Sequence, residues 1–208
     1  QEEIHKLAEL FKQSETKINR LPYIICDEPY RAITYNGKTV ASIFNEYNNS
    51  VILTSFAKNL SIPGERIGYL CVNPSCSESK ELIASCILAT RILGYVNAPA
   101  FFQKVIAKSW QCKCDYSLYE KRCNEITEIM DYAELKYIKP EGAFYLFVKV
   151  PEKWNNDDMA FTDHMKKFNI LCAPGTGFGC KGWFRISYCV AEQTILNSKE
   201  AFYKAVHE

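Results

Sequence analysis

Long hydrophobic runs are missing from this 208-residue chain, and their absence limits the classes of protein to which it can belong. No apolar stretch approaches the roughly 20 residues that a membrane-spanning helix needs. The segment QEEIHKLAELF at the start is charged and helix-like, so no signal peptide is visible there. Because the formal net charge is only +1, electrostatics gives no reason to expect nucleic acid or an anionic membrane as a partner.

Paired cysteine motifs are also missing, although the chain has ten cysteines. No CxxC occurs, and the one close pair, Cys112 and Cys114, has no second pair that could complete a zinc site. Cys26, Cys71 and Cys172 fall in apolar segments, where cysteine packs as a small hydrophobic residue. We therefore expect reduced structural thiols, no metal site and a reducing, cytoplasmic environment.

Strands are fewer than a complete α/β sheet would need. Only three apolar segments, 21–26, 51–54 and 67–72, read as strands before a series of helices begins. A parallel sheet is normally covered on both faces by helices and has more strands than this. The hydrophobic content of 48% is otherwise that of an ordinary globular enzyme. We expect the chain to be the C-terminal part of a longer polypeptide.

The remaining pattern predicts two parts that meet near residues 114–116. In the first part, Ile4, Leu7, Ala8 and Phe11 form the apolar stripe of a helix over 2–15, and Asn36-Gly37 indicates a tight turn. Asp157 or Asn156 is the expected N-cap of a later helix. The other expected elements are helices over 78–93, 98–110, 116–133, 157–168 and 191–206, and strands over 135–138, 143–149, 169–173 and 183–188.

Chemically useful side chains follow two of the expected strands. Asp27 and Tyr30 come after strand 21–26, and Ser55, Lys58 and Arg66 come after strand 51–54. Open α/β sheets bind their ligands at the carboxyl ends of their strands. An amine, a hydroxyl, a guanidinium, a carboxylate and a phenol are together the groups needed to hold and operate pyridoxal phosphate (PLP).

The segment SFAKNLSIPGERIGY, residues 55–69, resembles the signature of the aspartate aminotransferase family, the class I/II PLP-dependent enzymes of fold type I. The shared pattern is Ser-x-x-Lys with an arginine eight residues after the lysine, inside Pro-Gly-x-Arg-x-Gly. One departure is Ala57, where many members have a second serine. The resemblance covers nearly the whole chain. It implies an α/β fold with the C-terminal part of the large PLP-binding domain over 1–115, and an interdomain helix with a complete small α+β domain over 116–208.

The resemblance also implies a role for each residue. Lys58 would bond the cofactor aldehyde and shuttle a proton, and Ser55 and Arg66 would hold the phosphate. Asp27 would keep the pyridine nitrogen protonated, and Tyr30 would donate to the ring oxygen. Arg185, in the apolar strand 183–188, would grip the α-carboxylate of an amino-acid substrate.

Each of these residues also has a structural interpretation. Lys58 alone could be a solvated loop lysine, Asp27 to Tyr30 a capped turn, and Arg185 a solvent-facing residue of an edge strand. The glycines of 173–179 are interpreted as turn formers, because no helix follows them as in a dinucleotide fingerprint. The segment Gly-Ala-Phe-Tyr at 142–145 resembles a motif in the small domain of the family and is expected to have a structural role in a strand. The three histidines fall in no motif.

The function implied by the resemblance is an aminotransferase that moves the amino group of an L-amino acid, of the aspartate type, to a 2-oxo acid in a ping-pong reaction. Family members are homodimers, and their upstream half supplies the rest of the cofactor site. We therefore expect the chain alone to hold half a site and to be inactive. Two alternatives stay open: a PLP-dependent carbon–sulfur β-lyase, and an aminotransferase-like effector domain of a transcription regulator.

Overall fold

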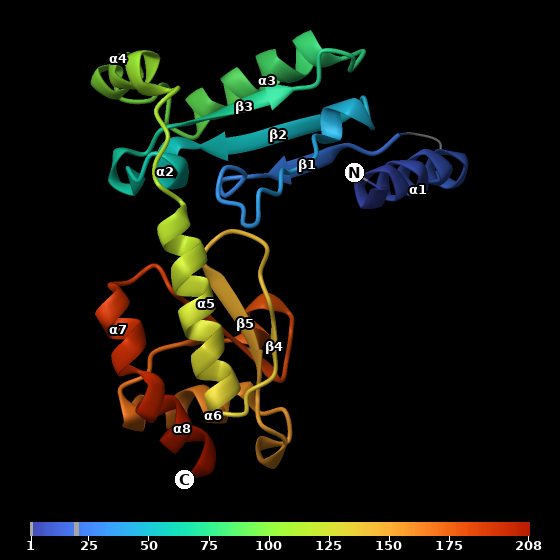
Figure 1. Ribbon diagram of the computed structural model, residues 1–208. Coiled ribbons are helices and arrows are strands. Elements are labelled where there is room, and N and C mark those ends of the chain that lie inside the picture. The colour runs from blue at the N-terminus through green and yellow to red at the C-terminus, as the bar shows by residue number, and fades with distance from the viewer. Residues whose placement is uncertain (1, 19–20) are drawn as a thin grey trace. The chain divides into compact units, whose positions relative to one another are not determined.

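The computed structural model describes residues 2–18 and 21–208, which form two compact units (Figure 1). The first unit comprises residues 1–32 and 39–114, and the second comprises 33–38 and 115–208. The segment Ile33–Lys38 thus leaves the first unit, joins the second and returns. The predicted division near residue 115 did not include this excursion.

The first unit contains a three-stranded sheet in the order β1-β2-β3. β1 and β2 are parallel, whereas β3 is antiparallel to β2, which departs from the parallel sheet that we expected. A parallel return would need a crossover, but residues 56–67 turn back after a short α-helix and a 3-10 turn at Pro63–Glu65. The α-helices and strands of the first unit are α1 (Glu2–Ile18), β1 (Ile24–Asp27), β2 (Ser50–Ser55), α2 (Phe56–Asn59), β3 (Gly68–Val72), α3 (Ser79–Ile92) and α4 (Ala100–Ser109).

Helix α1 covers part of this sheet through the apolar stripe that its sequence predicted. Ala8 is fully buried against Ile24 and Tyr47, and the Phe11 ring makes an edge contact with Tyr47 at 6.0 Å between centroids. Leu7 was expected on the stripe but is exposed. These buried contacts stabilise α1, since a helix within a protein gains most of its stability from packing its apolar face.

Helices α3 and α4 present much apolar surface. No residue of α3 is buried, and only Ile106 of α4 is. Ile92 and Phe101 are 75% and 70% exposed, so the predicted apolar faces exist but are not covered within the described chain. None of the helices in the described residues is long and apolar enough to cross a membrane.

The second unit contains an antiparallel sheet in the order β4-β5-β7-β6. The side chains of Leu146, Val148 and Phe184 are fully buried on one face, together with Phe161 and Met165 of helix α6. Aromatic and charged residues alternate with them on the opposite face. The elements are α5 (Ser117–Tyr132), β4 (Tyr137–Ile138), β5 (Tyr145–Lys149), α6 (Asp158–Met165), β6 (Ala173–Pro174), β7 (Trp183–Ser187), α7 (Glu192–Asn197) and α8 (Lys199–His207).

Two predictions from short sequence signals, an N-cap and a tight turn, are confirmed in the second unit. The Asp157 side chain caps α6 by accepting from Ala160 N at 2.9 Å. Asn36 and Gly37 both have positive φ, 54° and 67°, as a tight turn requires. The predicted helix over 191–206 is instead interrupted at Ser198, whose hydroxyl donates to Ile195 O at 2.7 Å. Such side-chain bonds compete with helical ones.

The ten cysteines are all free thiols, in environments that differ from those predicted. Cys71 is in β3 but exposed, so it does not serve as a small core residue. Cys172 lies just outside β6, which is much shorter than the expected strand 169–173. Pro174 cannot donate to a ladder, and Asn169 has the left-handed conformation, so little pairing is possible there.

Candidate active site

The carboxyl ends of β1 and β2 lie side by side. In the parallel register Asp27 pairs with Leu53, and Glu28 N donates to Leu53 O at 2.8 Å. Asp27 is the last residue of β1 and is exposed, and Ser55 ends β2 two residues beyond Leu53. The pairing therefore brings the turn after Asp27 next to the turn after Ser55.

Ser55 begins the short helix α2 that carries Lys58. Its hydroxyl oxygen accepts from Ala57 N at 3.3 Å, the usual N-cap interaction of serine. Lys58 lies in the last turn of α2, with its Nζ 6.0 Å from the centroid of the Tyr30 ring. Residues from the ends of two neighbouring strands thus lie near each other.

Arg66 lies on the segment that returns from α2 to β3. Its backbone is left-handed, with φ of 51°, and its Nη1 donates to Pro63 O at 2.7 Å. Gly68 pairs with Ser55, and an added Cβ on this glycine would meet Thr54 O at 2.5 Å. The glycine of the Pro-Gly-x-Arg-x-Gly motif thus lets β3 approach β2 closely beside Ser55.

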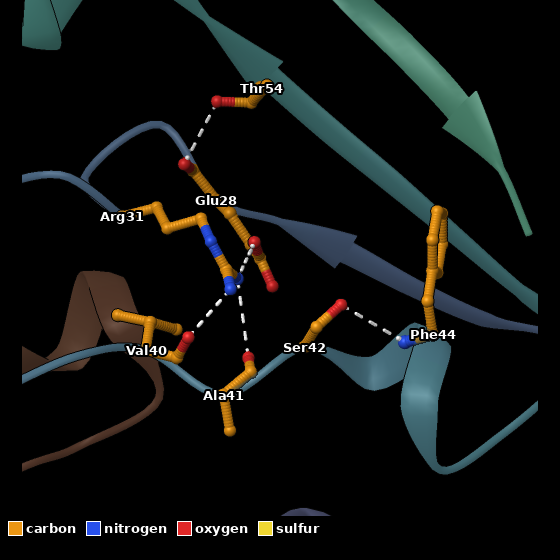
Figure 2. A network of polar contacts seen from close by, with 7 residues as sticks. All are labelled: Glu28, Arg31, Val40, Ala41, Ser42, Phe44 and Thr54. Atoms are coloured by element: carbon orange, nitrogen blue, oxygen red, sulfur yellow. Dashed lines mark hydrogen bonds and ion pairs between the residues drawn. The ribbon is translucent and has the colours of Figure 1, made fainter.

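An ion pair that the sequence reading missed braces the turn that carries Asp27 and Tyr30 (Figure 2). Arg31 Nη1 donates to Glu28 Oε2 at 2.6 Å, and Arg31 Nη2 donates to Val40 O at 2.6 Å. On the other side, Thr54 Oγ1 of β2 donates to Glu28 O at 3.1 Å. The charged pair at i and i+3 was a possible signal, but its backbone partners lie too far along the chain to be predicted.

Arg185 belongs to the second unit and is half-buried in β7. Its partners are Phe147 in β5 and Ala173 in β6, so β7 is not an edge strand at this position. The interpretation of Arg185 as an edge-strand residue is therefore wrong. Asp27, Tyr30, Ser55, Lys58 and Arg66 all belong to the first unit.

The described residues contain no cluster of side chains that could bind a metal ion. Among the described residues, no three His, Cys, Asp or Glu side chains gather as they would around an ion. His5 pairs with Glu46 at 2.8 Å, and His164 contacts Ala205 O at 3.1 Å, so both have structural partners.

Comparison with known proteins gives a consistent family. The sequence profile of aminotransferase class I and II matches residues 1–201. A (5-formylfuran-3-yl)methyl phosphate transaminase of Methanocaldococcus jannaschii is 28% identical over 201 residues, which cover 89% of this chain and 50% of that protein. A probable aspartate/prephenate aminotransferase of Aquifex aeolicus is 26% identical, with 99% and 54% covered.

Solved structures agree. The crystal structure of an amino transferase from Eubacterium rectale matches with a TM-score of 0.93 and 40% identity, over 99% of this chain and 51% of that chain. The chain therefore spans about half the length of the proteins that it matches. With a profile match over nearly all its residues and this likeness in fold, the chain belongs to the aminotransferase class I and II family.

Proposed function

We propose that this chain supplies the lysine-bearing part of a PLP-dependent aminotransferase. The observation that carries the proposal is the meeting of Lys58 with Tyr30, 6.0 Å from Nζ to the ring centroid, beside the strand that ends in Asp27. In this view residues 1–115 are the C-terminal part of the large cofactor-binding domain. Residues 116–208 are then the interdomain helix and the small domain.

The groups at the strand ends fit this cofactor. When bound, PLP withdraws electrons from the substrate carbon through its protonated pyridine ring. The exposed carboxylate of Asp27 would pair with the ring nitrogen, and a hydrogen bond to such a charged group contributes about 1.5–3 kcal/mol. The Tyr30 phenol would donate to the oxygen on the ring.

Ser55 and Arg66 would hold the phosphate. Since the Ser55 oxygen accepts from Ala57 N, its own O–H is directed elsewhere and can donate to a phosphate oxygen. Arg66 uses one N–H for Pro63 O and has further donors at the edge of its guanidinium. Phosphate is a good partner for both groups. The hydroxyl can donate one hydrogen bond to it, and the guanidinium can bind it bidentately.

Lys58 and Arg185 would act on the substrate. The Lys58 amine would accept the proton from the substrate α-carbon and later return it, as a general base and then acid. Arg185 would hold the α-carboxylate. We infer an aspartate-type amino donor, a 2-oxo acid acceptor and a ping-pong order, with a homodimer in the cytoplasm as the working form. The naming of the Aquifex relative as a probable aspartate/prephenate aminotransferase supports the choice of donor.

The test is Lys58→Ala in the complete protein. We expect loss of the visible absorbance of bound PLP, loss of borohydride-fixed label at residue 58, and loss of 2-oxoglutarate-dependent turnover. Lys80→Ala, an exposed lysine of α3, is the control and should leave all three unchanged. Full turnover by Lys58→Ala would overturn the proposal. Release of homocysteine, pyruvate and ammonia from cystathionine, or of sulfide, pyruvate and ammonia from cysteine, without amino transfer, would favour the β-lyase instead.

A further inference from the structure

Arg185 is held by aromatic rings, not by a carboxylate. Its Cζ lies 4.2 Å from the centroid of the Phe178 ring and 4.3 Å from that of Tyr145. Among the residues that the structure describes, no ion pair or hydrogen bond of the Arg185 guanidinium is found. A half-buried guanidinium without an anion is costly unless one is supplied from outside.

The strand pairing explains why Tyr145 reaches Arg185. In the antiparallel register Phe147 lies directly opposite Arg185, and Tyr145 lies two residues along β5. Diagonal neighbours on one face of such a pair are within reach of long side chains. Phe184 and Ile186 point to the buried face, so Arg185 points to the face that carries Tyr145.

Phe178 comes from the glycine-rich turn, whose shape is fixed by the second unit's core. Gly175 is buried, and an added Cβ would meet Cys180 O at 2.2 Å. Asp158, which is 1% exposed, accepts from Thr176 N at 2.7 Å and from Thr176 Oγ1 at 2.9 Å. A turn constrained at both ends presents the half-exposed Phe178 ring in one place.

We propose that Phe178 and Tyr145 are positioning residues that preset the Arg185 guanidinium for a planar carboxylate. This inference rests on the proposed function, because it assigns that carboxylate to the amino-acid substrate. Ring faces attract a cation without using its N–H donors, so the donors at the guanidinium edge stay available for a bidentate pair. Holding the group in place also lowers the conformational entropy lost when the carboxylate binds.

The test compares Phe178→Leu with Phe178→Tyr in the complete PLP-loaded protein. Phe178→Leu should weaken the affinity for maleate, a plain dicarboxylate, about two- to five-fold, the factor that corresponds to about 0.5–1 kcal/mol for an exposed cation–π contact. KM for the amino acid should rise by a similar factor with kcat nearly unchanged, while an amine lacking the carboxylate should react as before. Phe178→Tyr should restore affinity.

Two further measurements separate this inference from the proposed function. The NMR signal of the Arg185 Nε–H group should carry an upfield ring-current shift that Phe178→Leu reduces. Tyr203→Leu removes a similarly exposed ring from α8 and should change neither the shift nor the affinity. Unchanged maleate affinity in an active Phe178→Leu enzyme would overturn the inference alone. Weakened maleate affinity in a protein that never transaminates would keep the inference as a carboxylate site and overturn the proposed function.

Discussion

Asp158 combines deep burial with full hydrogen bonding, and its ionisation reflects both. Burial favours the neutral acid and would raise the pKa of Asp158. The bonds from Thr176 N, Thr176 Oγ1 and Gly182 N favour the carboxylate and outweigh burial, so the pKa is held below its ordinary value. The carboxylate therefore stabilises the folded turn as long as it is charged.

Asp158→Asn should destabilise the second unit by about 1–3 kcal/mol, because amide hydrogens would replace an acceptor of buried donors. The pH dependence has a definite sign. A folded pKa below the unfolded one gives stability that is present above the unfolded value of about 3.9 and is lost as the pH falls through the folded pKa. Urea unfolding between pH 7 and pH 3, followed by the fluorescence of Trp154 and Trp183, should show this loss in the wild type and much less of it in Asp158→Asn.

Asp163→Asn is the matched control, since Asp163 is exposed on the same helix and pairs only with Lys166 among the described residues. Exposed pairs of this kind contribute little. Equal destabilisation by both substitutions would contradict the assignment of the stabilising role to burial and hydrogen bonding at Asp158.

The two neighbouring aspartates also show what single residues reveal before a structure is known. Asp157 or Asn156 was predicted as the N-cap, and the partner of Asp157, Ala160 N, is only three residues away. Asp158 was not singled out, since its partners Thr176 and Gly182 lie about twenty residues further along. Phe178 was passed over for the same reason, although the strand that carries Arg185 was recognised.

Gly68 controls how closely β3 can pair with β2. Its position opposite Ser55 leaves no room for a Cβ beside Thr54 O, and backbone atoms cannot move aside cheaply. Gly68→Ala should therefore destabilise this strand pair by about 1–3 kcal/mol and displace Ser55. The midpoint temperature of thermal unfolding and the affinity of the complete protein for PLP should both fall.

Gly64→Ala is the control for this change. Gly64 lies in the same return segment but has open space where a Cβ would be added. Its substitution should leave PLP affinity unchanged. Loss of PLP affinity in Gly64→Ala to the same extent would point to the flexibility of the segment instead of the close approach at Gly68.

The elements themselves were largely predictable, and their arrangement was less so. Hydrophobic periodicity found β1, β2, β3 and β7 because buried strands repeat their apolar residues locally. The antiparallel direction of β3 depends on how residues 56–67 turn, which composition does not specify. The central position of β7 in its sheet shows that Arg185 is not an edge-strand residue. This position depends on pairing with segments far away in the chain.

The division into two units follows the chain only approximately, because Ile33–Lys38 belongs to the second unit although its neighbours on both sides belong to the first. Tyr35 anchors this segment. Its hydroxyl donates to Ala143 O and contacts the Tyr188 hydroxyl at 2.9 Å. Gly142 packs closely against Ile33, where an added Cβ would meet Ile33 O at 2.4 Å, and backbone bonds run from Tyr35 N to Glu141 O at 3.0 Å and from Ala143 N to Ile33 O at 2.9 Å. These contacts join residues more than a hundred positions apart, so no local pattern could have predicted them.

Tyr35→Phe should loosen this attachment and change the alkaline stability of the second unit. At pH 7 the loss of hydrogen bonds should cost about 0.5–1.5 kcal/mol. Burial raises the pKa of Tyr35 to about 12. An unfolded tyrosine ionises near 10, so the stability that the neutral phenol contributes is present below pH 10 and is lost as the pH rises toward 12.

Urea unfolding at pH 7, 10 and 11.5, followed by the fluorescence of Trp154 and Trp183, tests this expectation. Wild-type stability should fall more steeply above pH 10 than that of Tyr35→Phe, although Tyr188, whose pKa burial also raises, will contribute to both curves. Tyr203→Phe, which removes the hydroxyl of a more exposed tyrosine, should follow the wild type. Parallel curves for Tyr35→Phe and the wild type would mean that the Tyr35 hydroxyl does not secure the segment, and that the backbone bonds and packing at residues 141–143 join Ile33–Lys38 to the second unit.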